Sequence, residues 1–154
     1  MSKINLITSV LNTVSAPIGR LLISFIFLIS GLNKIGNYAN TSGWMESMGV
    51  SSSLLPLVII IEILAAIAII VGWKTKIAAF LLAGFCILSG LIFHNDFSKQ
   101  VEMIMLMKNF AIAGGFLILV VNGPGNFSLD KKIGDKTWLL IINLKILGQP
   151  IIDG

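Results

Sequence analysis

The sequence predicts an all-α protein, a four-helix transmembrane bundle with short interfacial helices at both ends. The chain of 154 residues is 56% hydrophobic and only 12% charged, with a mean hydropathy of +0.96. Soluble domains carry about 25% charged residues. The chain also holds four apolar runs near the length of about 20 residues that a helix needs to cross a bilayer. We expect residues 1–154 to form a single membrane domain, because the length leaves room for one bundle.

The elements follow in chain order from the apolar runs and the helix stop signals. Leu6–Val14 precedes Pro17, a residue that suits the first turn of a helix, so we expect a short surface helix over Leu6–Val14. Trp138–Leu147 is too short to span and contains Lys145, so we expect a second surface helix there. The four expected spans are Ile18–Ile35, Leu54–Val71, Ile77–Phe93 and Met103–Val121.

The basic residues fall mostly on one side of these spans. That side would hold Lys3, Arg20, Lys74, Lys76, Lys131, Lys132, Lys136 and Lys145, and the other side Lys34, Lys99 and Lys108. Because cytoplasmic loops of membrane proteins are enriched in Lys and Arg, both termini of this multi-pass chain are expected in the cytoplasm. The loops Gly36–Ser53 and His94–Glu102 are then expected outside.

Several function classes are disfavoured by the composition. The net charge of +4 is spread over loop ends, without the basic stripe that nucleic-acid binding needs. Cys86 is the single cysteine, so no internal disulfide forms, and no His/Cys cluster has metal-ligand spacing. No nucleophile with a base, dinucleotide fingerprint or phosphate loop is present. Nothing therefore indicates a self-sufficient enzyme, and whether the chain takes part in catalysis stays open.

The ionisable residues of the spans lie on the small-residue faces of their helices. Glu62 is followed by alanines at +3 and +4, His94 is in line with Gly90 and Cys86, and Lys108 is in line with Gly115. Polar side chains within spans face the bundle rather than lipid. From the depths of these residues we expect one outward-opening polar pocket. Its expected ligand-binding residues are Lys34, Glu62, His94, Lys108 and Asn109.

Ordered sequence motifs give the chain a family resemblance. They are Arg20, Phe27-x-x-Ser30-Gly31-Leu32-x-Lys34, Glu62 with Gly72-x-x-Thr75, Phe93-His94, Lys108-Asn109 with Gly114-Gly115, and Gly123-Pro124-Gly125-x-x-Ser128-Leu129-Asp130. By their order and spacing over residues 17–130, the chain resembles the DoxX family of small four-span bacterial inner-membrane proteins. The resemblance implies a four-helix membrane bundle. It also implies a link to quinone-dependent thiosulfate oxidation or to membrane-associated thiol-redox complexes.

Each candidate residue keeps two interpretations. Glu62, the first catalytic candidate, either accepts a proton beside a quinone or forms a structural ion pair with Lys108. His94, the second, either donates a proton or a hydrogen bond to a quinone carbonyl or caps the end of its helix. Lys108 and Asn109 either hold an anionic or carbonyl-bearing ligand, or Lys108 is the counter-ion of Glu62. Lys34 either extends its ammonium to the membrane rim or lines the pocket.

Two functions follow from these residues and the resemblance. The first is a membrane subunit of a redox-associated complex, with quinone as the expected cofactor and a redox protein or a second copy of the chain as the partner. The alternative is a non-enzymatic scaffold or assembly protein in the lipid bilayer. In both cases no metal and no nucleic acid are expected, and the location is the bacterial inner membrane.

Overall fold

The computed structural model describes residues 3–134, with side chains at residue 11 and from residue 13 onward. This part of the chain is all-α, as predicted. Its helices are α1 (Lys3–Gly36), α2 (Tyr38–Ser47), the short 3₁₀ helix η1 (Ser52–Leu54), α3 (Leu55–Val71), α4 (Thr75–Phe93) and α5 (Gln100–Asn122). Four helical stretches are long and apolar enough to cross a membrane: Thr13–Gly36, Ser52–Val71, Thr75–Phe93 and Gln100–Asn122. They confirm the four expected spans within a few residues.

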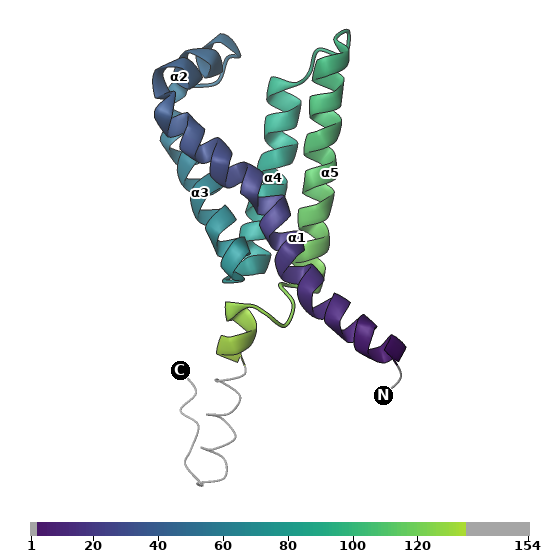
Figure 1. Ribbon diagram of the computed structural model, residues 1–154. Helices are drawn as coiled ribbons and strands as arrows, with labels where there is room; N and C mark the ends of the chain where they lie inside the picture. The colour runs from purple at the N-terminus through teal and green to yellow at the C-terminus, as the bar shows by residue number, and fades with distance from the viewer. Residues whose placement is uncertain (1–2, 135–154) are drawn as a thin grey trace, which may run out of the picture.

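The spanning helices form two pairs. α1 packs along α3, α5 packs along α4, and contacts between α3 and α4 join the pairs. Figure 1 shows α1 crossing α4 and α5 near one end of the bundle and diverging from them toward the other. We call the first end, with the α3–α4 turn, the inner end, and the second, with α2 and the α4–α5 loop, the outer end. The bundle is therefore closed at its inner end and splayed at its outer end.

Small side chains lie where the helices approach most closely. Ala66, Ala79 and Cys86 are fully buried at the centre of the core. Phe116 fills the remaining space beside them and is also fully buried. Large apolar side chains elsewhere are exposed, as on Val121 at 74%. This is the distribution expected of helices that pack through small residues and turn larger ones toward lipid.

Two connecting regions differ from the sequence predictions. The short helix expected at Leu6–Val14 is the first part of α1, which runs through Pro17 without interruption. Proline removes one N–H donor, but the helical apolar pattern continues on both sides of it. The expected loop Gly36–Ser53 contains α2, which is held by buried Met45 and by the stacking of Trp44 on Phe93. The surface helix expected at Trp138–Leu147 lies outside the described residues.

The segment after α5 closes the inner end of the bundle. The Asp130 carboxylate accepts hydrogen bonds from the backbone N–H groups of Lys74 at 2.7 Å and Thr75 at 2.9 Å. The Asp130 N–H donates to the Gly72 carbonyl at 2.8 Å. Asp130 therefore caps the N-terminus of α4 from a distant part of the chain, a role usually filled by the residue just before a helix.

Arg20 adds α1 to this closure. Its side chain is 3% exposed, and its Nη2 donates to the carbonyl of Phe127. Its Nη1 lies against Gly72, which has a φ of +73°. Three of the ordered sequence motifs, containing Arg20, Gly72 and Asp130, thus meet at one point.

We predict that Gly72→Ala lowers the free energy of unfolding by more than about 2 kcal/mol. The new Cβ would overlap Arg20 Nη1 and lie 2.9 Å from the Ser128 Cα, at a φ that L side chains rarely adopt. Thermal unfolding of the purified protein in detergent measures the effect. The matched control is Gly84→Ala, where no heavy atom lies within 4 Å of the added Cβ. Equal melting temperatures for the two variants would contradict the close packing described at Gly72.

We also predict an acid-dependent contribution from Asp130. Burial by itself raises the pKa of its carboxyl, but the N–H donors of Thr75 and Lys74 outweigh burial and leave the pKa below its usual range. The unfolded chain therefore takes up this proton near pH 4 and the folded protein only at lower pH. The stabilisation is complete above about pH 5 and is lost as the pH falls through the folded-state pKa.

Melting temperatures of the protein and of Asp130→Asn between about pH 2.5 and pH 7 check this prediction. The gap between the two proteins should be constant at neutral pH and shrink below about pH 4. Glu46→Gln, which changes an exposed carboxylate at the outer end, serves as the control. A gap that is independent of pH would exclude the charged form of Asp130 as the capping group.

Candidate functional site

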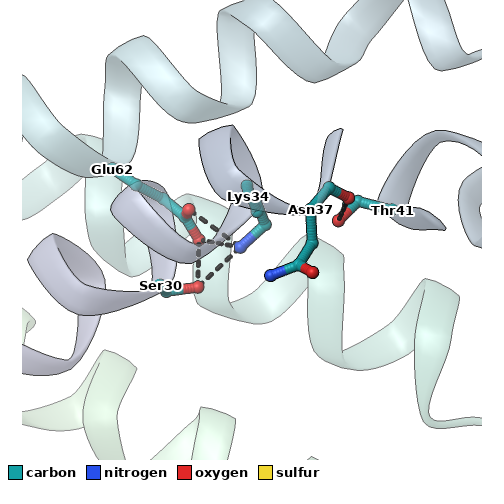
Figure 2. A network of polar contacts seen from close by, with 5 residues as sticks. All are labelled: Ser30, Lys34, Asn37, Thr41 and Glu62. Carbon is teal, nitrogen blue, oxygen red and sulfur yellow. Dashed lines mark hydrogen bonds and ion pairs between the residues drawn. The ribbon is translucent and has the colours of Figure 1, made fainter. Parts of the chain in front are cut away.

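Glu62 forms a buried ion pair with Lys34 across α3 and α1. Glu62 is 2% exposed, and Lys34 Nζ donates to its Oε1 at 2.9 Å and to its Oε2 at 2.8 Å. Ser30 joins the pair: its Oγ donates to Glu62 Oε1 at 3.2 Å and accepts from Lys34 Nζ at 2.6 Å. Figure 2 shows these three side chains converging beside Asn37 and Thr41, which lie at the α1–α2 junction. The carboxylate is thereby neutralised by charge and by hydrogen bonding.

The interpretation of Glu62 as the ion-pair partner of Lys108, one of the two kept open above, is wrong, because Glu62 pairs with Lys34. Lys108 is exposed, and its Nζ contacts Met105 Sδ at 3.1 Å on its own helix. The reason is the pairing of helices, since α3 packs closely on α1 while α5 packs on α4. Gly31 permits that close approach, because a Cβ there would lie 2.6 Å from Ile63 Cγ1. Lys34 is consequently part of the pocket wall and not a rim lysine.

His94 ends α4 and is tied to α5. Its Nδ1 lies 2.7 Å from Glu102 Oε2, and the two side chains are 25% and 31% exposed. Its backbone N–H donates to the Gly90 carbonyl, so His94 also caps the end of α4, as the second of its two interpretations expected. The sequence reasoning missed Glu102, although an acid in the first turn of the next helix was a usable signal. With Nδ1 engaged, the Nε2 of His94 is the ring atom left for a ligand.

All five expected pocket residues line one cavity. Its volume is about 240 Å³, and helices α1 to α5 all contribute to the wall. The polar wall is formed by Ser30, Lys34, Thr41, Glu62, Ser89, His94, Lys108 and Asn109. The structure thus brings Lys34, Glu62, His94, Lys108 and Asn109 together. Their role in binding a ligand stays a prediction.

Aromatic side chains make up much of the remaining wall. Phe27, Phe85, Phe93 and Trp44 all line the cavity. Trp44 stacks on Phe93 with ring centroids 4.5 Å apart and planes inclined by 24°. Phe27 meets Phe85 edge to face at 6.4 Å. The sequence reasoning did not find these rings, because aromatic residues at helical spacing are equally typical of an ordinary core.

The polar wall is rich in hydrogen-bond donors. The Lys108 ammonium and the Asn109 amide lie on it, and Asn109 also donates to its own helix at the Met105 carbonyl. The Lys34 ammonium lies on it too, but its donors are engaged by Ser30 and Glu62. Such donors recognise carbonyl, phenolate or carboxylate oxygen atoms. Within residues 13–134, no three side chains of the His, Cys, Asp and Glu types gather to hold a metal ion.

The sequence of the chain matches a known protein family over about half of its length. The family model described as DoxX matches residues 16–95, which include α1 from Ala16 onward, α2, α3 and α4. The chain belongs to the DoxX family. Because four of its described helices are long and apolar enough to cross a membrane, it is a multi-pass membrane protein.

Two similar proteins come from Escherichia coli strain K12. Inner membrane protein YqjF is 41% identical over 128 residues, which cover 83% of this chain and 98% of YqjF. Inner membrane protein YphA is 33% identical over 122 residues, which cover 75% of this chain and 87% of YphA. Uncharacterized protein T02E1.7 of Caenorhabditis elegans is 30% identical over 71 residues, 44% of this chain and 26% of that protein. No solved structure matches the chain.

We predict strong energetic coupling between Lys34 and Glu62 and none between Lys108 and Glu62. Lys34→Met leaves a buried carboxyl without its partner, which costs about 3–5 kcal/mol in buried pairs. Adding Glu62→Gln should recover a large part of that loss. A double-mutant cycle on unfolding free energies in detergent measures the coupling.

The matched cycle pairs Glu62→Gln with Lys108→Met, and its coupling energy should lie within about 0.5 kcal/mol of zero. Coupling that is larger with Lys108 than with Lys34 would overturn the assignment of the counter-ion.

Proposed function

We propose that the outer cavity binds the ring of a membrane quinone, and that the protein is the quinone-binding membrane subunit of a redox-associated complex. The observation that carries the proposal is the combination in one cavity of aromatic walls, hydrogen-bond donors and a buried ion pair. A quinone ring has two flat apolar faces and two carbonyl oxygens at its edges. Aromatic rings and donors in one wall are the groups that such a ligand needs.

The size of the cavity suits a single ring. An apolar cavity of about 150 Å³ holds benzene in another protein. The 240 Å³ here leaves room for ring substituents but not for a dinucleotide. α1 and α5 diverge toward the outer end (Figure 1), and Ile26 on α1 and Ile112 on α5 both line the cavity, so an isoprenoid tail would leave along these apolar side chains.

The Glu62–Lys34–Ser30 network supplies the proton chemistry that the proposal needs. Reduction of a quinone to a quinol consumes two electrons and two protons. The electrons would come from a redox partner protein. The network holds exchangeable protons on the Lys34 ammonium and the Ser30 hydroxyl, next to the cavity. When Lys34 Nζ gives a proton to the reduced ring, Glu62 would take up a proton from solvent, so that both members of the pair become neutral together and no unpaired charge stays in the membrane. Transfer of that proton from Glu62 to Lys34 would then restore the ion pair for delivery of the second proton.

The proposed location is the bacterial inner membrane, with both termini in the cytoplasm. The names of the Escherichia coli relatives support the membrane assignment. The excess of Lys and Arg at the inner end supports the orientation. The cavity would then open at the outer leaflet, and a redox partner would reach it from that side.

We predict that ubiquinone-1 quenches the fluorescence of Trp44, which stands in the cavity wall. Binding to purified protein in detergent should weaken by about tenfold, or 1.4 kcal/mol, in Asn109→Leu and in Lys108→Met, because each loses a donor to a carbonyl. Lys132→Met at the inner end is the control and should bind as the unaltered protein does. Trp44→Phe should remove the quenching signal and so assign it to this cavity.

Solvent extraction of the purified protein should also yield bound quinone. If folded protein carries no quinone and shows no quenching, the quinone proposal fails. Partner proteins that co-purify with quinone-free protein, together with pocket variants that leave the cellular phenotype unchanged, would support the scaffold function instead.

A further inference from the structure

A second hollow lies between α1 and α5 at the inner end. This groove has a volume of about 290 Å³ and belongs to a different part of the molecule from the outer cavity. Ser15, Arg20 and Asn122 supply its polar wall, and Ile23, Ile118 and Leu119 its apolar wall. It lies where α1 crosses α5 (Figure 1). The groove therefore combines a polar part with an apolar part beside the lipid-facing surface.

Arg20 in the groove wall has unused hydrogen-bond donors. Its side chain is 97% buried, and Nη2 donates to the Phe127 carbonyl. Its Nε and Nη1 have no hydrogen-bond partner among the described residues. A buried donor without an acceptor costs about 1–3 kcal/mol, and more when it is charged. Both atoms are enclosed, and Nη1 lies against Gly72, so Arg20 contributes its positive charge to the groove and not a hydrogen bond.

The surroundings of Arg20 are strongly basic. Lys76 Nζ reaches the Val121 carbonyl at 3.3 Å, and Lys76 Cε lies 3.5 Å from the Cβ position of Gly123 in the groove wall. In the described part of the inner end, one acid, Asp130, accompanies several bases. These bases are Arg20, Lys74, Lys76, Lys131 and Lys132. The excess positive charge favours an anion over a water molecule as the occupant.

The flanks of the groove carry exposed apolar side chains, as expected of a surface that faces the hydrocarbon of a bilayer. Leu22 on α1 is 71% exposed, and Ile118 and Val121 on α5 are 65% and 74% exposed. An occupant arriving from this side would be dissolved in the membrane. Basic pockets between spanning helices on the cytoplasmic side are a known setting for anionic lipid headgroups.

We propose that this groove binds one anionic phospholipid from the leaflet at the inner end. The phosphate lies at the polar wall, within the field of Arg20 and Lys76, and an acyl chain follows Ile23 and Ile118 toward the bilayer centre. This site is independent of the quinone proposal, because it uses other residues at the opposite end of the bundle.

Gly19→Leu tests the proposal without disturbing the fold. Gly19 lines the groove, and no heavy atom lies within 4 Å of the position of an added Cβ, so a leucine fills the groove instead of clashing. Leucine is also a better helix former than glycine. The matched control is Gly84→Leu, since Gly84 is equally open but lies on α4 away from the groove. Lys76→Gln removes the charge at the mouth of the groove and leaves its shape unaltered.

Native mass spectrometry of the purified protein in detergent, with added phosphatidylglycerol or phosphatidylcholine, measures the binding. The unaltered protein and Gly84→Leu should retain one phosphatidylglycerol in preference to phosphatidylcholine. Retention should fall by at least about fivefold in Gly19→Leu and about threefold in Lys76→Gln. Melting temperatures should rise with phosphatidylglycerol in the unaltered protein and not in Gly19→Leu.

Three outcomes would overturn the proposal. Equal retention of phosphatidylglycerol by Gly19→Leu and Gly84→Leu would assign the lipid to the general membrane-facing surface. Equal retention of phosphatidylglycerol and phosphatidylcholine would exclude recognition of negative charge. A rise in melting temperature with inorganic phosphate alone, equal to that with phosphatidylglycerol, would make the groove a site for a free anion.

Discussion

The ion pair between Glu62 and Lys34 is the constraint on which the outer half of the molecule depends. A carboxylate within a membrane span is costly unless a charge and hydrogen bonds compensate it. The compensation comes from Lys34 and Ser30 on one helix, so α1 must lie against α3 in one register. Gly31 allows the backbones to approach closely enough for that register. The need to neutralise the buried charge of Glu62 thus fixes the packing of α1 on α3, which is more extensive than its packing on α5.

The two ends of the bundle are built in opposite ways. At the inner end, Asp130 and Arg20 draw the segment after α5, the α3–α4 turn and α1 together. At the outer end, α1 and α3 separate from α4 and α5, and short-range contacts such as the stack of Trp44 on Phe93 bridge the space. A closed end gives the fold its stability, while a splayed end leaves a cavity whose wall can serve a ligand.

Much of the fold could be predicted from the sequence, because a membrane restricts the choices. Apolar runs of spanning length and the glycine and proline residues that follow them gave the four spans within a few residues. The rule that polar groups face the bundle placed Lys34, Glu62, His94, Lys108 and Asn109 on one cavity wall. The helix α2 escaped prediction because its residues carry no strong periodic pattern, and its position depends on Met45 and Trp44 finding partners on other helices.

Pairing among the polar residues could not be predicted in the same way. Glu62 had two lysines within plausible depth, and the sequence reasoning chose Lys108 over Lys34. The pattern of apolar and polar residues by itself determined that the chain crosses a membrane four times and turns its ionisable groups inward. The tertiary structure alone decided which helices are neighbours, and hence that Lys34 neutralises Glu62, Glu102 meets His94, and Asp130 caps α4. The physical reason is that depth and facing are properties of one helix, whereas a salt bridge or a cap requires two segments within about 3 Å of each other.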